Sequence, residues 1–201
     1  MSMAQPTLAE IVEAVLLAAD RPLTPEQLQQ LFDPPEQPSL SQLREALTRV
    51  GVAAEGRGYE LKEVASGWRM QVRARFAPWV TRLAQEKPPR YSRALLETLA
   101  LILYRQPITR AEIEAVRGVA VSSSIMKSLL EQGWIAVIGH REVPGRPAIY
   151  ATTRQLLDHF NLKSLSELPP LAELVDLNVS HPQLELGELD PPTTPLTREH
   201  P

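Results

Sequence analysis

The stretch RQPITRAEIEAVRG, residues 105–118, contains the signals that begin and end a helix. Thr109 stands three residues before Glu112, which is the spacing of a capping box, in which each side chain bonds the backbone N–H of the other residue. An apolar ladder follows, and Gly118 is the residue type that commonly ends a helix. Apolar segments on both sides predict one helix before this one and another after it. We therefore expect a helix-turn-helix, an arrangement that many DNA-binding proteins use.

The same pattern occurs 85 residues earlier in the chain. LLAADRPLTPEQLQQL, residues 16–31, aligns with LILYRQPITRAEIEAV, residues 101–116. In both segments an apolar helix ends, a turn with proline follows, and a threonine caps the next helix, Thr24 in the first and Thr109 in the second. Pro25 takes the first helical position, where a missing N–H costs nothing. The repeat predicts that one small module has been duplicated.

The first copy continues with a third helix and a hairpin. Ser39 or Ser41 opens an apolar-periodic segment that Gly51 is expected to end. Residues 59–72, YELKEVASGWRMQV, then alternate apolar and polar side chains around a Ser-Gly turn, which is typical of a β-hairpin. A short helix over residues 76–83 is expected to lead into the second copy.

The second copy repeats this order. Ser122 or Ser123 opens a helix that Gly133 ends, and residues 134–153 give two strands around the turn REVPGRP. A last short helix, residues 154–160, closes the copy. Three helices followed by a hairpin make a winged helix. The predicted fold is therefore mainly α with small β-hairpins (the α+β class), built as tandem winged-helix domains.

Composition marks the boundaries between these parts. The net charge is −1 over residues 1–89, +3 over residues 90–160 and −5 over residues 161–201. EKPPR, with two prolines, is typical of a stiff linker, and the proline-rich C-terminal stretch lacks periodicity. We predict an N-terminal winged helix (1–85), a linker (86–90), a C-terminal winged helix (91–168) and an acidic, proline-rich, disordered tail (169–201).

Several classes of protein fit the sequence poorly. The chain has no cysteine, which excludes thiol chemistry and favours a reducing compartment. The apolar N-terminal run is interrupted by Glu10, Glu13 and Asp20, so it predicts an amphipathic helix rather than a signal peptide or a membrane span.

The sequence contains no recognisable constellation for catalysis. The run Ser122 to Ser124 is better explained as a helix cap than as a nucleophile, because a nucleophile needs an oriented base beside it. His140 and His159 lack the spacing of metal ligands, and no glycine-rich phosphate loop is present. We therefore predict no catalytic residues, no metal and no cofactor, and hence a protein that is not an enzyme.

Specific DNA binding is the alternative function, as in a tandem winged-helix transcriptional regulator. In a winged helix the third helix would read the major groove. In the second copy the outward side chains of that helix include only one basic residue, Lys127, beside Glu131. Phosphate contacts dominate affinity for DNA, and this surface offers few. Weak contact through His140, Arg141 and Arg146 of the second hairpin remains open.

Protein partners are the third possibility. Aromatic residues often anchor interfaces, although each can equally belong to a core. The acidic tail could fold onto a partner or serve only solubility. The aromatic candidates are Trp68, Trp79, Trp134, Tyr91 and Tyr104, and the apolar tail residues are Leu171, Leu174, Val175 and Leu177.

Residues 91–171 resemble one bacterial family. They contain the phrases YRQPITRAEIE, RGVAVSS, LLEQGWI, GHREVPGRPAIYATT and FNLKSLSELPPL, which are distinctive of segregation and condensation protein B. The likeness continues upstream in GYELKEVASGWRMQVRARFAPWVTRL, residues 58–83. It covers most of residues 7–171 and not the tail.

The resemblance implies a function that composition does not show. Proteins of this family are non-catalytic accessory subunits of the bacterial condensin complex and form homodimers, mainly through the N-terminal winged helix. The dimer binds the kleisin subunit, segregation and condensation protein A, largely through the C-terminal winged helix. The kleisin bridges the heads of the structural-maintenance-of-chromosomes (SMC) ATPase. We expect a role in chromosome condensation and partition during the cell cycle and cell division, with a cytoplasmic, nucleoid-associated location and no membrane contact.

The resemblance also nominates residues for two contacts. For the kleisin they cluster in the second copy, although some could simply set turn geometry or belong to the core: Tyr104, Arg105, Gln106, Arg141, Pro144, Arg146, Pro147 and Tyr150. For dimerisation they lie in the first helix and its neighbours, where one face must also serve the copy's own core: Leu8, Ile11, Val12, Val15, Leu23 and Leu28.

Overall fold

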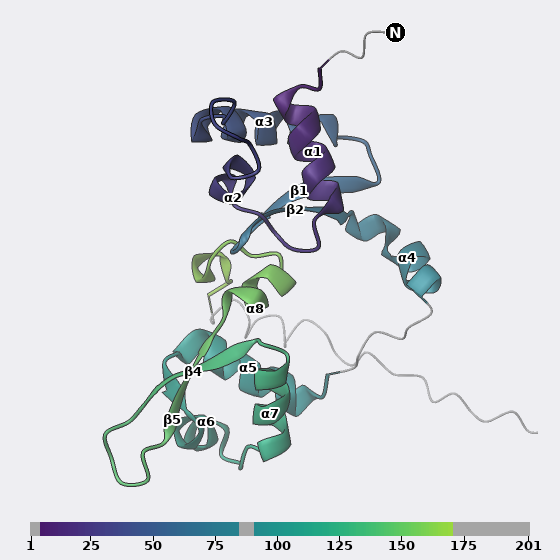
Figure 1. Ribbon diagram of the computed structural model, residues 1–201. Helices are drawn as coiled ribbons and strands as arrows, with labels where there is room; N and C mark the ends of the chain where they lie inside the picture. The colour runs from purple at the N-terminus through teal and green to yellow at the C-terminus, as the bar shows by residue number, and fades with distance from the viewer. Residues whose placement is uncertain (1–4, 85–90, 171–201) are drawn as a thin grey trace, which may run out of the picture. The chain divides into compact units, whose positions relative to one another are not determined.

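The computed structural model describes residues 5–84 and 91–170 (Figure 1). These residues form helices with two small antiparallel sheets, which confirms the predicted α+β class. The predicted linker, residues 86–90, lies outside the described residues, and so does the predicted tail from residue 171 onward, including its four apolar candidates. None of the described helices has the length and apolar character to cross a membrane.

The first copy has the predicted order of three helices and a hairpin. The helices begin at capping boxes made by Thr7, Thr24 and Ser39, in which each side chain accepts a bond from the backbone N–H three residues on. The elements are α1 (Leu8–Ala18), α2 (Pro25–Gln29), α3 (Leu40–Ala53), β1 (Tyr59–Val64) and β2 (Gly67–Val72), followed by the 3-10 turn η1 (Ala74–Phe76) and α4 (Ala77–Ala84).

The prediction that Gly51 ends the third helix was wrong. Helix α3 runs through this glycine to Ala53, because the next turn is held by tertiary contacts. Ala54 is buried, and its carbonyl accepts a bond from the Arg73 guanidinium at 3.1 Å. An interior glycine costs a helix only about 1 kcal/mol, which packing of this kind can offset.

A core of apolar side chains lies between these helices and the hairpin. Leu23, in the turn before α2, exchanges two backbone bonds with Trp68 of β2, at 2.9 and 2.8 Å. This pairing ties the helix-turn-helix to the hairpin. The buried members of the core are Val12, Leu16, Leu28, Leu43, Ala46, Leu47 and Val50, with Leu61, Trp68 and Met70 packed against them.

The second copy repeats the design with one strand that the sequence did not predict. Strand β3 (Ile108–Thr109) pairs with β5, so the sheet order is β3-β5-β4. Ile108 aligns with Leu23 of the first copy, so the residue before each capping threonine contacts the hairpin in both copies. The other elements are α5 (Arg93–Arg105), α6 (Arg110–Arg117), α7 (Ser123–Glu131), β4 (Ile135–His140), β5 (Ala148–Thr152), α8 (Arg154–His159) and the 3-10 turn η2 (Leu165–Glu167).

A separate core fills the second copy. Trp134 is buried, with the rings of Tyr91 and His159 each centred 4.9 Å from its own. Strand β4 lies at the edge of the sheet and carries a bulge between Val137 and Gly139. The buried members of this core are Leu95, Leu99, Ile102, Ile108, Ile113, Val121, Met126, Leu129, Trp134, Ile135 and Leu156. Because each copy has its own core and the helix and strand order of a winged helix, we interpret the chain as two such modules.

The first module should depend strongly on Gly67. This residue has a φ of +132°, and a Cβ placed there would lie 2.5 Å from the backbone carbon and oxygen of Leu23. Gly118 also has a positive φ, of +71°, but a Cβ there would meet nothing within 4 Å. We expect Gly118→Ala to cost about 1–2 kcal/mol for its left-handed backbone. Gly67→Ala should cost about 4 kcal/mol, because the clash separates Leu23 from Trp68.

Urea unfolding followed by tryptophan fluorescence would measure both variants. Equal losses of stability in the two variants would show that the close approach of Gly67 to Leu23 is not a constraint on the module.

Candidate protein-binding groove

A groove of about 380 Å³ lies in the second module, beside β3 and α6. Its apolar part includes Val116, whose side chain is 47 % exposed although it continues the apolar ladder of α6. Arg105, at the end of α5, and Glu112, in the first turn of α6, supply charge. The lining residues are Arg105, Pro107, Ile108, Glu112, Ala115 and Val116. An apolar floor with charged groups beside it suits an apolar side chain of a partner protein.

The groove floor is fixed by the turn between α5 and α6. The Gln106 side-chain oxygen accepts bonds from the backbone N–H and the hydroxyl of Thr152, at 2.7 and 2.9 Å. Ile108 is buried in the core and pairs with Tyr150 across the sheet. The turn is therefore held to β5 on both sides of Pro107, and the floor is built before any partner arrives.

Glu112 joins the capping box to the second hairpin. One carboxylate oxygen accepts the Thr109 backbone N–H at 2.7 Å and hydroxyl at 2.9 Å, and the other accepts the Arg141 guanidinium at 3.0 Å. The bonds from Thr109, with the nearby Arg141 charge, hold the pKa of Glu112 below its ordinary value. The carboxylate thus stays ionised beside the groove and holds Arg141 in an ion pair.

The two terminal arginines of α6, Arg110 and Arg117, have internal roles that the sequence analysis missed. Arg110 bonds Glu114 at 3.0 Å, Ser123 at 3.2 Å and the Val121 carbonyl, which fixes the turn between α6 and α7. Arg117 is almost buried and contacts Glu97 and Thr98 of α5, at 3.0 and 3.3 Å. The four-residue spacing of Arg110 and Glu114 was a usable signal for the first of these roles.

The residues nominated for the kleisin do not form one cluster. Arg105 lines the groove, whereas Arg141 does not line it but bonds Glu112, which does. Gln106 and Tyr150 hold the floor, and Tyr104 is half-buried on the neighbouring helix. The nominated residues in the turn between β4 and β5, Pro144, Arg146 and Pro147, do not line the groove. Pro144 and Arg146 are exposed, and Arg146 lies 3.4 Å from Glu142. The Pro147 carbonyl accepts the backbone N–H of Arg141. The sequence analysis missed Pro107, Ile108, Glu112, Ala115 and Val116 as groove residues.

Five of the six residues nominated for dimerisation belong to the first module's own core or pack against it. Val12 and Leu28 are buried there, and Leu8, Val15 and Leu23 pack against the same core. Ile11 is half-buried. Leu8, Val15 and Leu23 are half-buried as well, so part of this set stays accessible and its role in dimerisation stays a prediction.

The presumptive DNA-reading helices carry paired charges. On α7, Lys127 lies 3.6 Å from Glu131, and on α3, Arg49 lies 2.6 Å from Glu45. Each cation therefore has a carboxylate one turn away on the surface that would face phosphates, which weakens its attraction for DNA.

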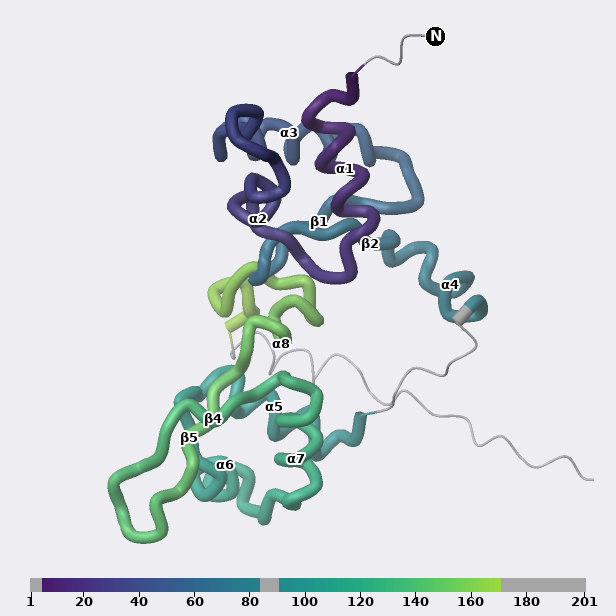
Figure 2. Tube along the Cα trace, viewed as in Figure 1, coloured from purple at the N-terminus to yellow at the C-terminus, as the bar shows by residue number. Residues whose placement is uncertain are grey.

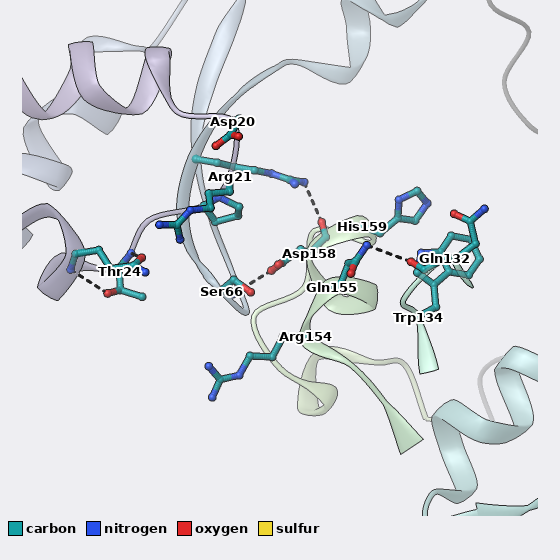
Figure 3. A pocket seen from close by; sticks show the side chains of 13 residues that line it. Asp20, Arg21, Thr24, Ser66, Gln132, Trp134, Arg154, Gln155, Asp158 and His159 are labelled. Atoms are coloured by element: carbon teal, nitrogen blue, oxygen red, sulfur yellow. Dashed lines mark hydrogen bonds between the residues drawn. The ribbon is translucent and has the colours of Figure 1, made fainter. Parts of the chain in front are cut away.

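A second, polar pocket of about 700 Å³ has Arg21, Arg69 and Arg154 among its lining residues. Figure 3 shows the side chains that line it. Much of its polar surface is already bonded. The Asp158 carboxylate accepts the Ser66 N–H at 2.9 Å, and Arg69 donates to the Asp158 carbonyl at 2.9 Å and to Asn161 at 2.8 Å. Within residues 5–84 and 91–170, no group of three His, Asp or Glu side chains could hold a metal. The pocket holds a structural network rather than a nucleophile with its base.

Two helix-and-hairpin modules, one of them bearing an apolar groove, are the features of a protein-binding subunit. The family described as "Segregation and condensation complex subunit ScpB" matches residues 10–171. The chain therefore belongs to the ScpB family, as its motifs predicted.

Relatives and solved structures are similar over most of the chain. A segregation and condensation protein B homolog of Coxiella burnetii is 59% identical over 167 residues, which cover 83% of this chain and 80% of the relative. The segregation and condensation protein B of Syntrophotalea carbinolica is 43% identical, with 85% of each chain covered. The crystal structure of ScpB from Mycobacterium tuberculosis is 37% identical over 80% of this chain and 98% of that one, with a TM-score of 0.36.

The Glu112 capping box should stabilise the fold in a pH-dependent way. Its folded pKa is lowered, so the carboxylate contributes stability that is present above the unfolded pKa, about 4.3, and lost as pH falls through the folded pKa. Glu112→Gln should therefore lower the free energy of unfolding by less than about 1 kcal/mol at pH 7, because the side chain is half exposed. At the lowest pH at which the protein is still folded, the substitution should change the free energy of unfolding very little.

Urea unfolding of both proteins at a series of pH values would measure this difference. Lys127→Gln, on an exposed surface pair, is the control. A cost for Glu112→Gln that stays constant with pH would contradict the role of its ionised form.

Proposed function

We propose that this chain is a non-catalytic accessory subunit of a bacterial SMC–kleisin complex. It acts as a homodimer, binds the kleisin ScpA and supports chromosome condensation and segregation in the cytoplasm, at the nucleoid. Membership of a family of segregation and condensation complex subunits supports this role. The paired charges on α3 and α7 favour it over sequence-specific DNA reading.

The groove beside β3 and α6 is the main structural support for the proposed contact with the kleisin. An amphipathic helix in a groove buries apolar side chains spaced by three or four residues. Here Val116 and the floor around Ile108 would receive one such anchor. Arg105 would attract a carboxylate of the same helix, and Glu112 with Arg141 would exclude water beside it. Within this proposal, residues 91–168 form the kleisin-binding module and residues 1–85 the dimerisation module.

Val116→Glu should weaken kleisin binding. It places a charge over the apolar floor while leaving the buried core untouched, since the wild-type side chain is already half exposed. We expect the dissociation constant for the central fragment of the kleisin to rise by about 30-fold or more. This is the effect typical of substituting a residue at the centre of an interface. Arg105→Glu should have a smaller effect in the same direction. Isothermal titration calorimetry with the full chain measures both.

Leu96→Glu is the matched control. Leu96 is 46 % exposed on α5, nine residues before Arg105, and does not line the groove. Equal losses in Val116→Glu and Leu96→Glu would place the kleisin elsewhere. Light scattering during size exclusion, with and without the fragment, would give the stoichiometry. If the chain does not bind the fragment but binds one DNA duplex with an affinity that falls steeply with salt, the result would support the alternative function as a transcriptional regulator.

A further inference from the structure

The turn of the first hairpin is bonded to the segment that ends α8. The Ala65 N–H donates to the Leu162 carbonyl at 2.9 Å. The Ser66 N–H donates to the Asp158 carboxylate at 2.9 Å, a bond drawn in Figure 3. Figure 2 shows the turn between β1 and β2 meeting the light green segment that follows α8. Direct bonds, as well as the chain itself, therefore join the two modules.

Charged side chains add to this contact. The Arg69 guanidinium donates to the Asp158 carbonyl at 2.9 Å and to the Asn161 side-chain oxygen at 2.8 Å. The Lys163 ammonium lies 2.5 Å from the Glu63 carboxylate. With the two bonds of the hairpin turn, five bonds connect the first hairpin to the end of the second module, and we call this set the module contact.

The end of α8 suits the module contact as well as its own helix. Asn161 has a φ of +59°, in the left-handed region that glycine usually fills at the end of a helix. The Leu162 N–H bonds the Leu157 carbonyl at 2.8 Å, and the backbone N–H of Asn161 bonds the carbonyl three residues before it at 3.1 Å, which is the pattern of a Schellman motif. Glycine would make the same two bonds with less backbone strain. The asparagine adds the side-chain oxygen that accepts Arg69.

Two buried apolar side chains beside these bonds belong to neither core. Val64, just before the hairpin turn, is 3 % exposed, and Leu157, just before Asp158, is 8 % exposed. Neither is a member of the apolar clusters that fill the two modules. Contact between the hairpin turn and the end of α8 accounts for their burial. The described residues up to Leu168 accordingly form one compact unit.

The module contact is nevertheless weak enough to open. Its bonds are polar, the side chains of Lys163 and Glu63 are 52 % and 37 % exposed, and the polar pocket of about 700 Å³ lies beside it. A hydrogen bond that is exchanged for one with water contributes little net stability, and so does an exposed ion pair. Because each module has its own core, separating the modules exposes little apolar surface. Small polar contacts between domains permit relative motion.

From these observations we infer that the module contact is a reversible latch. When it is closed, it holds the two modules in one arrangement, and when it opens, it releases them without unfolding either. A partner seated in the groove beside β3 and α6 is held in a fixed orientation relative to the first module only while the latch is closed. The inference concerns the free chain and does not rest on the proposed function.

The distance between the modules in solution tests the latch. Because the chain has no cysteine, Thr48→Cys on α3 and Ala100→Cys on α5 place one exposed spin label in each module. Double electron–electron resonance then measures the distance between the labels. An excess of unlabelled chain ensures that only distances within one chain contribute. We expect one narrow distance in the chain that carries no other substitution.

Two latch variants should change this distance. Arg69→Ala with Asp158→Ala removes three of the five bonds and should replace the narrow distance by a broad distribution. Lys163→Glu places two carboxylates together and should broaden the distribution as well, with little risk to the fold because the side chain is exposed. Adding Glu63→Lys to Lys163→Glu restores an ion pair of opposite polarity and should restore the narrow distance.

The matched control is Lys127→Ala with Glu131→Ala, which removes an exposed ion pair within α7. Circular dichroism checks that each variant remains folded. A narrow distance that broadens in the latch variants and not in the control supports the inference. A broad distribution without latch substitutions, a narrow distance that both latch variants leave unchanged, or broadening that the control shares overturns it. None of these outcomes bears on the proposed function, which titration with the kleisin fragment tests.

Discussion

The structure depends on one backbone contact that occurs in both modules: the residue before the capping threonine pairs with the hairpin. Leu23 bonds Trp68 in the first module, and Ile108 pairs with Tyr150 in the second. A two-stranded hairpin alone is marginally stable in water. Joined to the helix-turn-helix, it closes one side of the core and fixes where the second helix begins. The groove floor follows from the same contact, since Ile108 is part of it.

Many charged side chains of the described residues make bonds within the chain that stabilise this framework. Arg110 and Arg117 bind the helices of the second module to one another, and Arg73 closes the end of α3. Arg49 of α3 and Lys127 of α7 each lie beside a carboxylate. Several arginines of a module with the shape used to read DNA are therefore engaged in bonds within the module itself. The features left for recognition are an apolar groove with charge beside it and the exposed Trp79 and Leu83 of α4.

The sequence predicts local features well and long-range ones poorly. The caps at Thr24, Ser39, Thr109 and Ser122 were predictable because the donor and acceptor lie three residues apart. Strand β3 was missed because its partner lies about 40 residues away and two residues carry no strand pattern. Val116 reads as a core residue by its spacing, and only the position of β3 shows that a groove opens beside it. Trp68, Trp79 and Trp134 likewise look alike in sequence, and only packing separates the exposed one from the two in cores.

The bulge in β4 has a consequence for how this protein can associate. The strand lies at the sheet edge, where a regular row of N–H and C=O groups would invite a strand from another chain. The extra residue between Val137 and Gly139 breaks that row and turns its side chain outward. Extension of the sheet from copy to copy, the usual route to open-ended fibres, is interrupted at this point. Pairing of β4 with a strand of another chain is thereby disfavoured, and the apolar groove beside α6 remains the surface of this module that suits a partner.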